Sequence, residues 1–90
     1  MNDKWESPGP VSELFGVALQ ESEVWLDRDP GAVARIACHA KVLGSDVAFR
    51  RWLRVGNPLL EKTSPLEWIR LGRAREVAEF VEDADAGQPT

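Results

Sequence analysis

The sequence predicts an all-α fold, a small bundle of about five short helices in a single domain. Apolar residues recur at three-residue and four-residue intervals along most of the chain, which is the period of a helix buried on one face. Two capping residues each stand directly before a proline, as is typical of helix starts. No segment shows the sustained alternation of β-branched residues that marks a strand.

Residues 1–10 contain two prolines and a glycine without apolar periodicity, so we expect a flexible lead-in there. Residues 11–28 should be helical, with one shared apolar face. Gly16 and the acidic run from Glu21 leave two alternatives, one bent helix or two short helices with a turn near Gly16 to Leu19. The apolar face of this segment consists of Val11, Leu14, Phe15, Ala18, Trp25 and Leu26.

Residues 29–83 should supply the rest of the bundle. Asp29 caps and Pro30 begins a helix that ends at Gly44, a left-handed C-cap. Ser45 or Asp46 then caps a further helix that is closed by Gly56. We expect its arginines to point largely away from the apolar side, which consists of Ala48, Phe49, Trp52, Leu53 and Val55.

Ser64 is the N-cap of a short helix, with Pro65 at the first position and Glu67 placed to reach back to the Ser64 amide. The last helix follows, and residues 84–90 should form a flexible acidic tail. The buried face of that last helix consists of Ala74, Val77, Ala78 and Val81.

The tryptophans differ in their surroundings. Trp52 and Trp68 lie on amphipathic segments, which favours a place in the core. Trp5 lies in the polar lead-in, where it either folds back onto the domain or anchors a partner.

Charge is distributed unevenly along the chain, whose net charge is −4. Residues 1–30 hold seven acidic and two basic side chains, residues 31–60 one acidic and five basic, and residues 61–90 seven acidic and four basic. A short basic stretch in an acidic protein is more often a solvated helix face than a nucleic-acid site. Candidate DNA contacts in this stretch are Arg50, Arg51 and Arg54.

Catalytic chemistry is poorly represented, so we expect a protein that is not an enzyme and needs no cofactor. His39 and Cys38 are neighbours and point about 100° apart on a helix, which separates them as a catalytic pair. His39 is better explained as a partly buried structural residue. No Cys or His set has zinc spacing. The lone cysteine, the lack of a signal peptide and the lack of a membrane-spanning stretch indicate the cytoplasm.

One motif carries a family resemblance. A helix ends with a tryptophan in "RWLRVGNP", an Asn-Pro turn follows, and the chain resumes at Ser-Pro-Leu-Glu before a final helix. The segment from about Ala32 to Ala86 therefore resembles the toxin-binding domain of the Xre/MbcA/ParS antitoxin family. Glu61-Lys62 stands where that family often has a glycine pair, and Arg73 stands where a glycine often precedes the last helix. The motif residues are Trp52, Asn57, Pro58, Ser64, Pro65, Leu66, Glu67 and Val77.

The resemblance implies a partner, a RES-type toxin that degrades NAD, and a homodimer that assembles with toxin subunits. The C-terminal end of such an antitoxin occupies or covers the entrance of the toxin's active site. A pocket that receives NAD phosphates should attract an acidic tail, and Glu82, Asp83 and Asp85 would mimic the charge of the substrate. Carried over by position, the partner-binding residues are Arg75, Glu79, Glu82, Asp83, Asp85 and Thr90.

Residues 11–28 are similar to part of a helix-turn-helix, with Gly16-Val17 at the turn. The would-be recognition helix carries Glu21 and Glu23, whose charges repel phosphates, so a shortened relic packed on the bundle is favoured. The alternative function is a DNA-binding regulator of its own operon that uses residues 12–28 or the three arginines. A further alternative is an adaptor for an unrelated partner.

Overall fold

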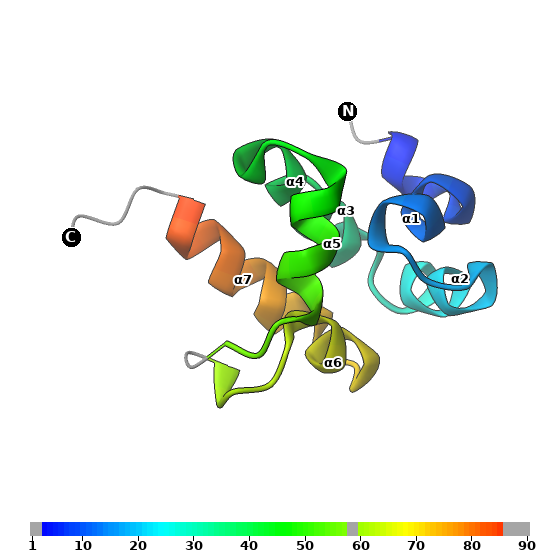
Figure 1. The fold of residues 1–90 in the computed structure, drawn as a ribbon. Coiled ribbons are helices and arrows are strands. Elements are labelled where there is room, and N and C mark those ends of the chain that lie inside the picture. The colour runs from blue at the N-terminus through cyan, green and yellow to red at the C-terminus, as the bar shows by residue number, and fades with distance from the viewer. Residues whose placement is uncertain (1–2, 58–59, 86–90) are drawn as a thin grey trace.

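The computed structural model describes residues 3–57 and 60–85, and every regular element among them is a helix (Figure 1), which confirms the all-α prediction. Pro58, Thr90 and the end of the predicted tail lie outside the described residues. In chain order the elements are a 3-10 helix η1 (Asp3–Glu6), α1 (Pro8–Phe15), α2 (Leu19–Arg28), α3 (Pro30–Ala37), α4 (His39–Leu43), α5 (Asp46–Arg54), α6 (Pro65–Arg70) and α7 (Ala74–Asp85).

The core lies where α1, α3, α5 and α7 meet. Phe15 makes edge-to-face contacts with Trp25 at 5.4 Å and with Phe49 at 5.1 Å between ring centroids, which joins α1, α2 and α5. The other large side chains that are almost completely buried are Val11, Val33, Ile36, Leu53, Ile69, Val77 and Val81. These positions follow the helical spacing of the sequence, so the apolar faces were predicted correctly for most helices.

Residues 3–10, which were expected to be a flexible lead-in, form η1 and the start of α1, with the extended Ser7 between them. Pro8 occupies the first turn of α1, where its missing N–H leaves no hydrogen bond unmade. The buried Ser22 hydroxyl of α2 reaches two acceptors, the Leu19 carbonyl oxygen at 2.7 Å and the Pro8 carbonyl oxygen at 3.1 Å, so the start of α1 lies directly against α2. Trp5 is half-buried and packs against the core, so the first of its two alternatives holds.

Residues 11–28 resolve into two helices. Gly16 ends α1 in the left-handed conformation with φ of 70°, and its N–H donates to the Ser12 carbonyl oxygen. The Ser12 hydroxyl donates to the Val17 carbonyl oxygen at 2.6 Å and so closes the turn. Glycine at this position allows the left-handed turn, so the segment forms two short helices and not one bent helix.

The predicted helix from Pro30 to Leu43 is interrupted once, at Cys38, and becomes α3 and α4. Its start is confirmed, because the Asp29 side chain accepts from the Ala32 N–H at 3.1 Å. Beyond the interruption His39 is buried, with its ring 4.8 Å from that of Trp52, whereas Cys38 is exposed. His39 is therefore buried, as expected for a structural residue, and Cys38 separates α3 from α4 within a segment whose apolar periodicity is continuous.

The helix α5 is capped by Ser45, whose hydroxyl oxygen accepts from the Ala48 N–H at 3.1 Å. Val55 was expected on the apolar side but is 57% exposed. The reason is local, because α5 ends at Arg54 and Val55 adopts an extended conformation that takes it off the helix face.

The last two helices follow the loop between α5 and α6. Asn57 and Thr63 form an isolated antiparallel bridge at the base of this loop. The Ser64 cap is confirmed by its hydrogen bond from the Glu67 N–H at 3.2 Å. The predicted buried face of α7 is also confirmed, since Ala74, Val77, Ala78 and Val81 are all buried.

Candidate partner-binding site

The exposed face of α7 holds the side chains predicted to contact a partner. Arg75, Glu79, Glu82 and Asp83 are exposed, whereas the opposite face of the helix is packed on the bundle. In Figure 1 the C-terminal end of α7 projects away from the other helices. Asp85 is the last residue of α7. The structure therefore presents four of the six predicted partner-binding side chains on one accessible helix.

Glu82 is already paired within the chain. Arg35 of α3 donates from Nε to Oε2 at 2.7 Å and from Nη2 to Oε1 at 2.5 Å, a two-point contact between a planar guanidinium and a carboxylate. The hydrogen bond from Arg35 lowers the pKa of Glu82 below its ordinary value. The two residues are 47 positions apart, so no local sequence signal could have revealed the pair.

The other predicted contacts differ in how they are held. Arg75 lies 3.6 Å from the Asp29 carboxylate, between Nε and Oδ2, so its charge faces the start of α3. Asp29 thus caps α3 with one oxygen and meets Arg75 with the other. Within the described part of the chain, Glu79 and Asp83 form no ion pair or hydrogen bond through their side chains. Among the described carboxylates of α7, these two make no direct contact with a cation, although the charge of Glu79 helps to raise the pKa of Arg35.

The motif residues mainly hold the fold. Trp52 is half-buried between the His39 and Phe49 rings, and Val77 is completely inaccessible to solvent. Pro65 and Leu66, the first two residues of α6, are buried, while Glu67 is exposed. The side chains of this motif therefore fix the connection between α5, α6 and α7 and leave little of their own surface for a partner.

The turn at Glu61 and Lys62 has the conformation that a glycine pair would favour. Their φ angles are 58° and 67°, and the Thr63 N–H donates to the Leu60 carbonyl oxygen at 3.0 Å. Positive φ at both central residues identifies a type I′ turn, which usually holds Asn-Gly or Gly-Gly. Glu61 and Lys62 therefore adopt this turn with side chains that are exposed to solvent.

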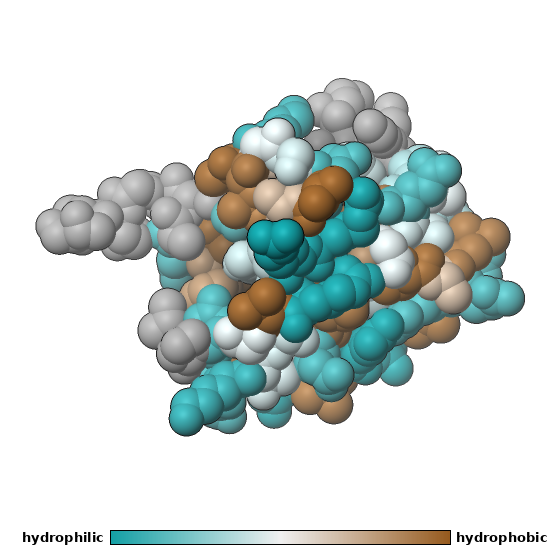
Figure 2. All heavy atoms as spheres, in the orientation of Figure 1, coloured by the Kyte–Doolittle hydropathy of each residue, from teal (hydrophilic) through white to brown (hydrophobic). Residues whose placement is uncertain are grey.

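Two of the candidate DNA contacts are used inside the fold, which corrects the expectation that these arginines point away. Arg50 donates to the Glu13 carbonyl oxygen at 3.0 Å, and Arg54 donates to those of Phe15 and Gly16 at 3.0 Å and 2.7 Å. These carbonyl groups at the end of α1 have no helical partners, and their dipole attracts cations. Hydrophilic side chains cover the outer face of α5 (Figure 2), yet only Arg51 among the three lacks such a contact in the described structure.

The helix-turn-helix resemblance also gains no support from the surface charge of α2. Glu21 is held by Arg70 of α6, with Nε and Oε2 at 2.6 Å, and Glu23 is exposed. A recognition helix that presents acids to a major groove would repel the phosphates beside it. Arg50 and Arg54, which were considered as DNA contacts, thus bind carbonyl groups at the end of α1. The helix that would enter the DNA groove, α2, carries acidic side chains.

The described residues contain no group of three or more His, Cys, Asp and Glu side chains close enough to hold a metal ion. Among them there is also no helix with the length and apolar character needed to span a bilayer.

No family model, curated protein or solved structure matches this chain. The support for a function therefore comes from the motif, the exposed face of α7 and the charges that surround it.

Proposed function

We propose that this protein is an antitoxin that binds and neutralises a RES-type, NAD-degrading toxin. The observation that carries the proposal is the presentation of Glu79 and Asp83 on the exposed face of the last helix, while Val77, Ala78 and Val81 fix that helix to the core. The motif between α5 and α7 supports it through its resemblance to the toxin-binding domain of the Xre/MbcA/ParS family. The partner-binding unit would consist of α7 and the residues that follow it.

Electrostatics indicates how such a unit acts. An active site that binds the phosphates of NAD needs positive charge, and carboxylates on a rigid helix are attracted to it with little loss of conformational entropy. Glu79 and Asp83 are free to play this part, whereas Glu82 first has to leave Arg35. We therefore assign the substrate-mimicking charge to Glu79, Asp83 and Asp85 before Glu82.

The cytoplasm is the compartment that this function requires, because NAD and the toxin are met there. The exposed and unpaired thiol of Cys38 is consistent with a reducing environment. The chain itself would act by occupancy alone, as a non-enzymatic inhibitor without a cofactor.

The test begins with the tagged full chain expressed in its own host, followed by mass spectrometry of copurifying proteins and an NAD-consumption assay. We expect a stoichiometric RES-type protein that consumes NAD only after the antitoxin is removed. The double variant Glu79→Gln/Asp83→Asn should raise the concentration of this protein needed for half-maximal inhibition of NAD consumption by at least about tenfold, since two charge pairs with the toxin are lost. The matched control Glu13→Gln/Glu23→Gln removes two exposed acids from α1 and α2 and should inhibit like the native chain.

Two results would contradict the proposal. A copurifying partner without NAD-consuming activity would indicate an adaptor instead. Tight and salt-dependent binding to the upstream DNA would indicate a regulator, although the engagement of Arg50 and Arg54 by α1 argues against it.

A further inference from the structure

The end of α7 has a sequence that opposes a helix. Its last turn holds Glu82, Asp83 and Asp85 and no basic side chain. The carbonyl groups at a helix C-terminus form the negative end of its dipole, which repels acids and attracts cations. Glu79 adds to the repulsion, because it lies three residues before Glu82 and four before Asp83. A helix end of this composition needs a positive charge from another part of the chain.

Core packing holds α7 most firmly before this turn. Val77, Ala78 and Val81 are almost completely buried, whereas Glu82 and Asp83, which follow them, are exposed. Figure 1 shows the same end of the helix projecting away from the bundle. The side chains that the structure describes after Val81 are thus charged and exposed, so ionic contacts matter more than burial for the order of this turn.

Arg35 of α3 brings a positive charge to this place. It donates to both carboxylate oxygens of Glu82, from Nε at 2.7 Å and from Nη2 at 2.5 Å. The hydrogen bond with Glu82 raises the pKa of Arg35. The nearby charges of Glu79 and Asp29 raise this pKa further. One cation on α3 therefore attracts two acids of α7, and its two-point contact fixes an orientation as well as a distance.

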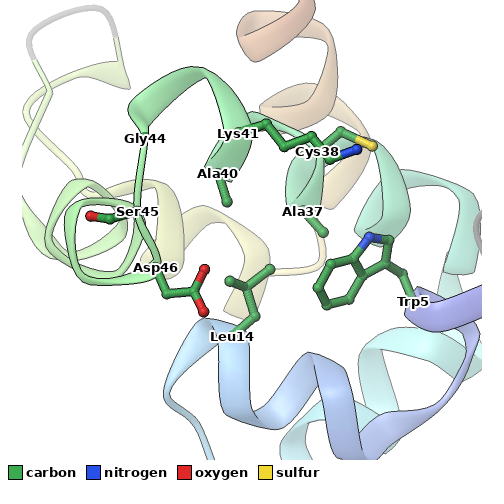
Figure 3. Close-up of a pocket in the computed structure, with 9 residues that line it drawn as sticks. All are labelled: Trp5, Leu14, Ala37, Cys38, Ala40, Lys41, Gly44, Ser45 and Asp46. Carbon is green, nitrogen blue, oxygen red and sulfur yellow. The ribbon is translucent and has the colours of Figure 1, made fainter.

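The helix that carries Arg35 is itself well supported. Val33, Ile36 and Ala37 of α3 are almost completely buried. Figure 3 shows Ala37 beside the indole of Trp5, at a surface pocket that both residues line. Because α3 is packed in this way, Arg35 can hold the end of α7 against a fixed base.

We propose that Arg35 is a positioning residue for partner recognition, which keeps the acidic end of α7 helical in the free chain and so presents Glu79 and Asp83 in a fixed arrangement. Glu82 stays paired with Arg35 in the complex. Order that exists before binding lowers the entropic cost of association. The role in recognition rests on the proposed function, whereas the ordering of α7 does not.

Amide hydrogen exchange of the free full chain, followed by NMR, tests the ordering. In Arg35→Gln the amides of residues 82–85 should exchange about two- to fivefold faster, the range for loss of an exposed two-point ion pair. Amides of residues 77–81 should change little, because the core holds them. The double variant Arg35→Glu/Glu82→Arg forms the pair again with its cation on α7 and should exchange as slowly as the native chain.

Inhibition of the copurified toxin tests the role in recognition, because charge alone predicts the opposite result. Arg35→Gln makes the chain more acidic, which by itself should strengthen binding to an electropositive active site. We expect instead that the concentration needed for half-maximal inhibition rises about two- to fivefold, since the end of α7 must first become ordered. The double variant should inhibit like the native chain.

The matched control is Arg51→Gln, which makes the same change of charge at an exposed arginine of α5. It should leave the exchange of residues 82–85 unchanged and should inhibit at least as well as the native chain. Urea unfolding of both variants shows whether a faster exchange is confined to the end of α7 or follows from a loss of overall stability.

Unchanged exchange at residues 82–85 in Arg35→Gln would overturn the proposal. Stronger inhibition by the same variant would overturn the role in recognition, because Arg35 would then act only as an opposing charge. A native chain that does not inhibit NAD consumption would contradict the proposed function instead, and the exchange rates would still decide whether Arg35 orders α7.

Discussion

Arg54, the last residue of α5, caps the end of α1 by donating from Nη2 to the Phe15 carbonyl oxygen at 3.0 Å. The same nitrogen donates to the Gly16 carbonyl oxygen at 2.7 Å, and Nη1 donates to the Arg50 carbonyl oxygen at 3.0 Å. One guanidinium thus serves carbonyl groups of two helices that are far apart in sequence. Arg54 belongs to the basic stretch that was considered as a DNA-binding face, and this contact shows that its guanidinium is used inside the fold.

Replacing Arg54 by alanine should therefore lower the free energy of unfolding. We expect a loss of about 1 kcal/mol, the range for a partly solvated cation at a helix C-terminus with hydrogen bonds to carbonyl groups. Arg54→Lys should recover only part of it, because an ammonium lacks the fork that reaches two acceptors. The control is Arg51→Ala, which removes an exposed arginine from the same helix and should change urea unfolding little. Equal losses in both alanine variants would refute a specific capping role.

The ion pair between Arg35 and Glu82 predicts that the free energy of unfolding decreases at acidic pH. Its hydrogen bond lowers the pKa of Glu82 in the folded chain, so the folded carboxylate binds its proton less readily than the unfolded one. The stabilisation is therefore present above the unfolded pKa, about 4.3, and is lost as the pH falls through the folded pKa. NMR titration of the Glu82 carboxyl should show the lowered pKa and its return toward the ordinary value in Arg35→Gln. An unchanged titration in that variant would exclude Arg35 as the cause.

Local signals explain why most helix boundaries could be predicted. Asp29, Ser45 and Ser64 each accept a hydrogen bond from an N–H three residues later, so the information for these starts lies within one turn of helix. The buried face of α7 follows from the helical period in the same way. The helical start at residues 3–10 was missed because what secures it, the Ser22 hydroxyl and the core beneath Trp5, lies outside that segment.

The candidate site was less predictable because its charges pair across the fold. Sequence position identified α7 as the exposed helix with acidic side chains, and it lies as expected on the surface. It could not show that Arg35 neutralises Glu82 or that Arg50 and Arg54 are turned toward α1, since both facts depend on how the helices pack. Periodicity assigns a residue to a face of a helix but does not say which neighbouring helix covers that face.

Gly56 should tolerate no side chain, although its φ is not positive. A Cβ atom at this position would lie 2.5 Å from the Lys62 carbonyl oxygen, across the loop that joins α5 to α6. Gly56→Ala should therefore cost roughly 1–3 kcal/mol in the free energy of unfolding, because backbone must move to relieve the contact. The control Gly31→Ala adds a methyl group in α3 whose nearest neighbour, the Asp29 carboxylate oxygen Oδ1, lies at an ordinary contact distance of 3.8 Å, and it should be neutral or slightly stabilising. A neutral Gly56→Ala would show that the loop moves freely.

The turn at Glu61 and Lys62 should be a place where the chain can be made more stable. Both residues have positive φ, which costs a residue with a side chain about 1–2 kcal/mol, and Asn-Gly is the pair that a type I′ turn favours. We expect Glu61→Asn/Lys62→Gly to raise the free energy of unfolding by about 1 kcal/mol, because glycine removes the strain but gains flexibility when unfolded. The measurement is urea unfolding of both proteins.

Glu23→Gly is the control for this last prediction, because Glu23 lies in the middle of α2. Glycine there should lower the free energy of unfolding by about 1 kcal/mol, since an ordinary helical position gains nothing from it. Opposite signs at the two positions would identify backbone conformation as the cause. A loss of stability at the turn as well would mean that the Glu61 and Lys62 side chains supply contacts worth more than the strain they impose, and these two exposed residues would then be the next candidates for partner recognition.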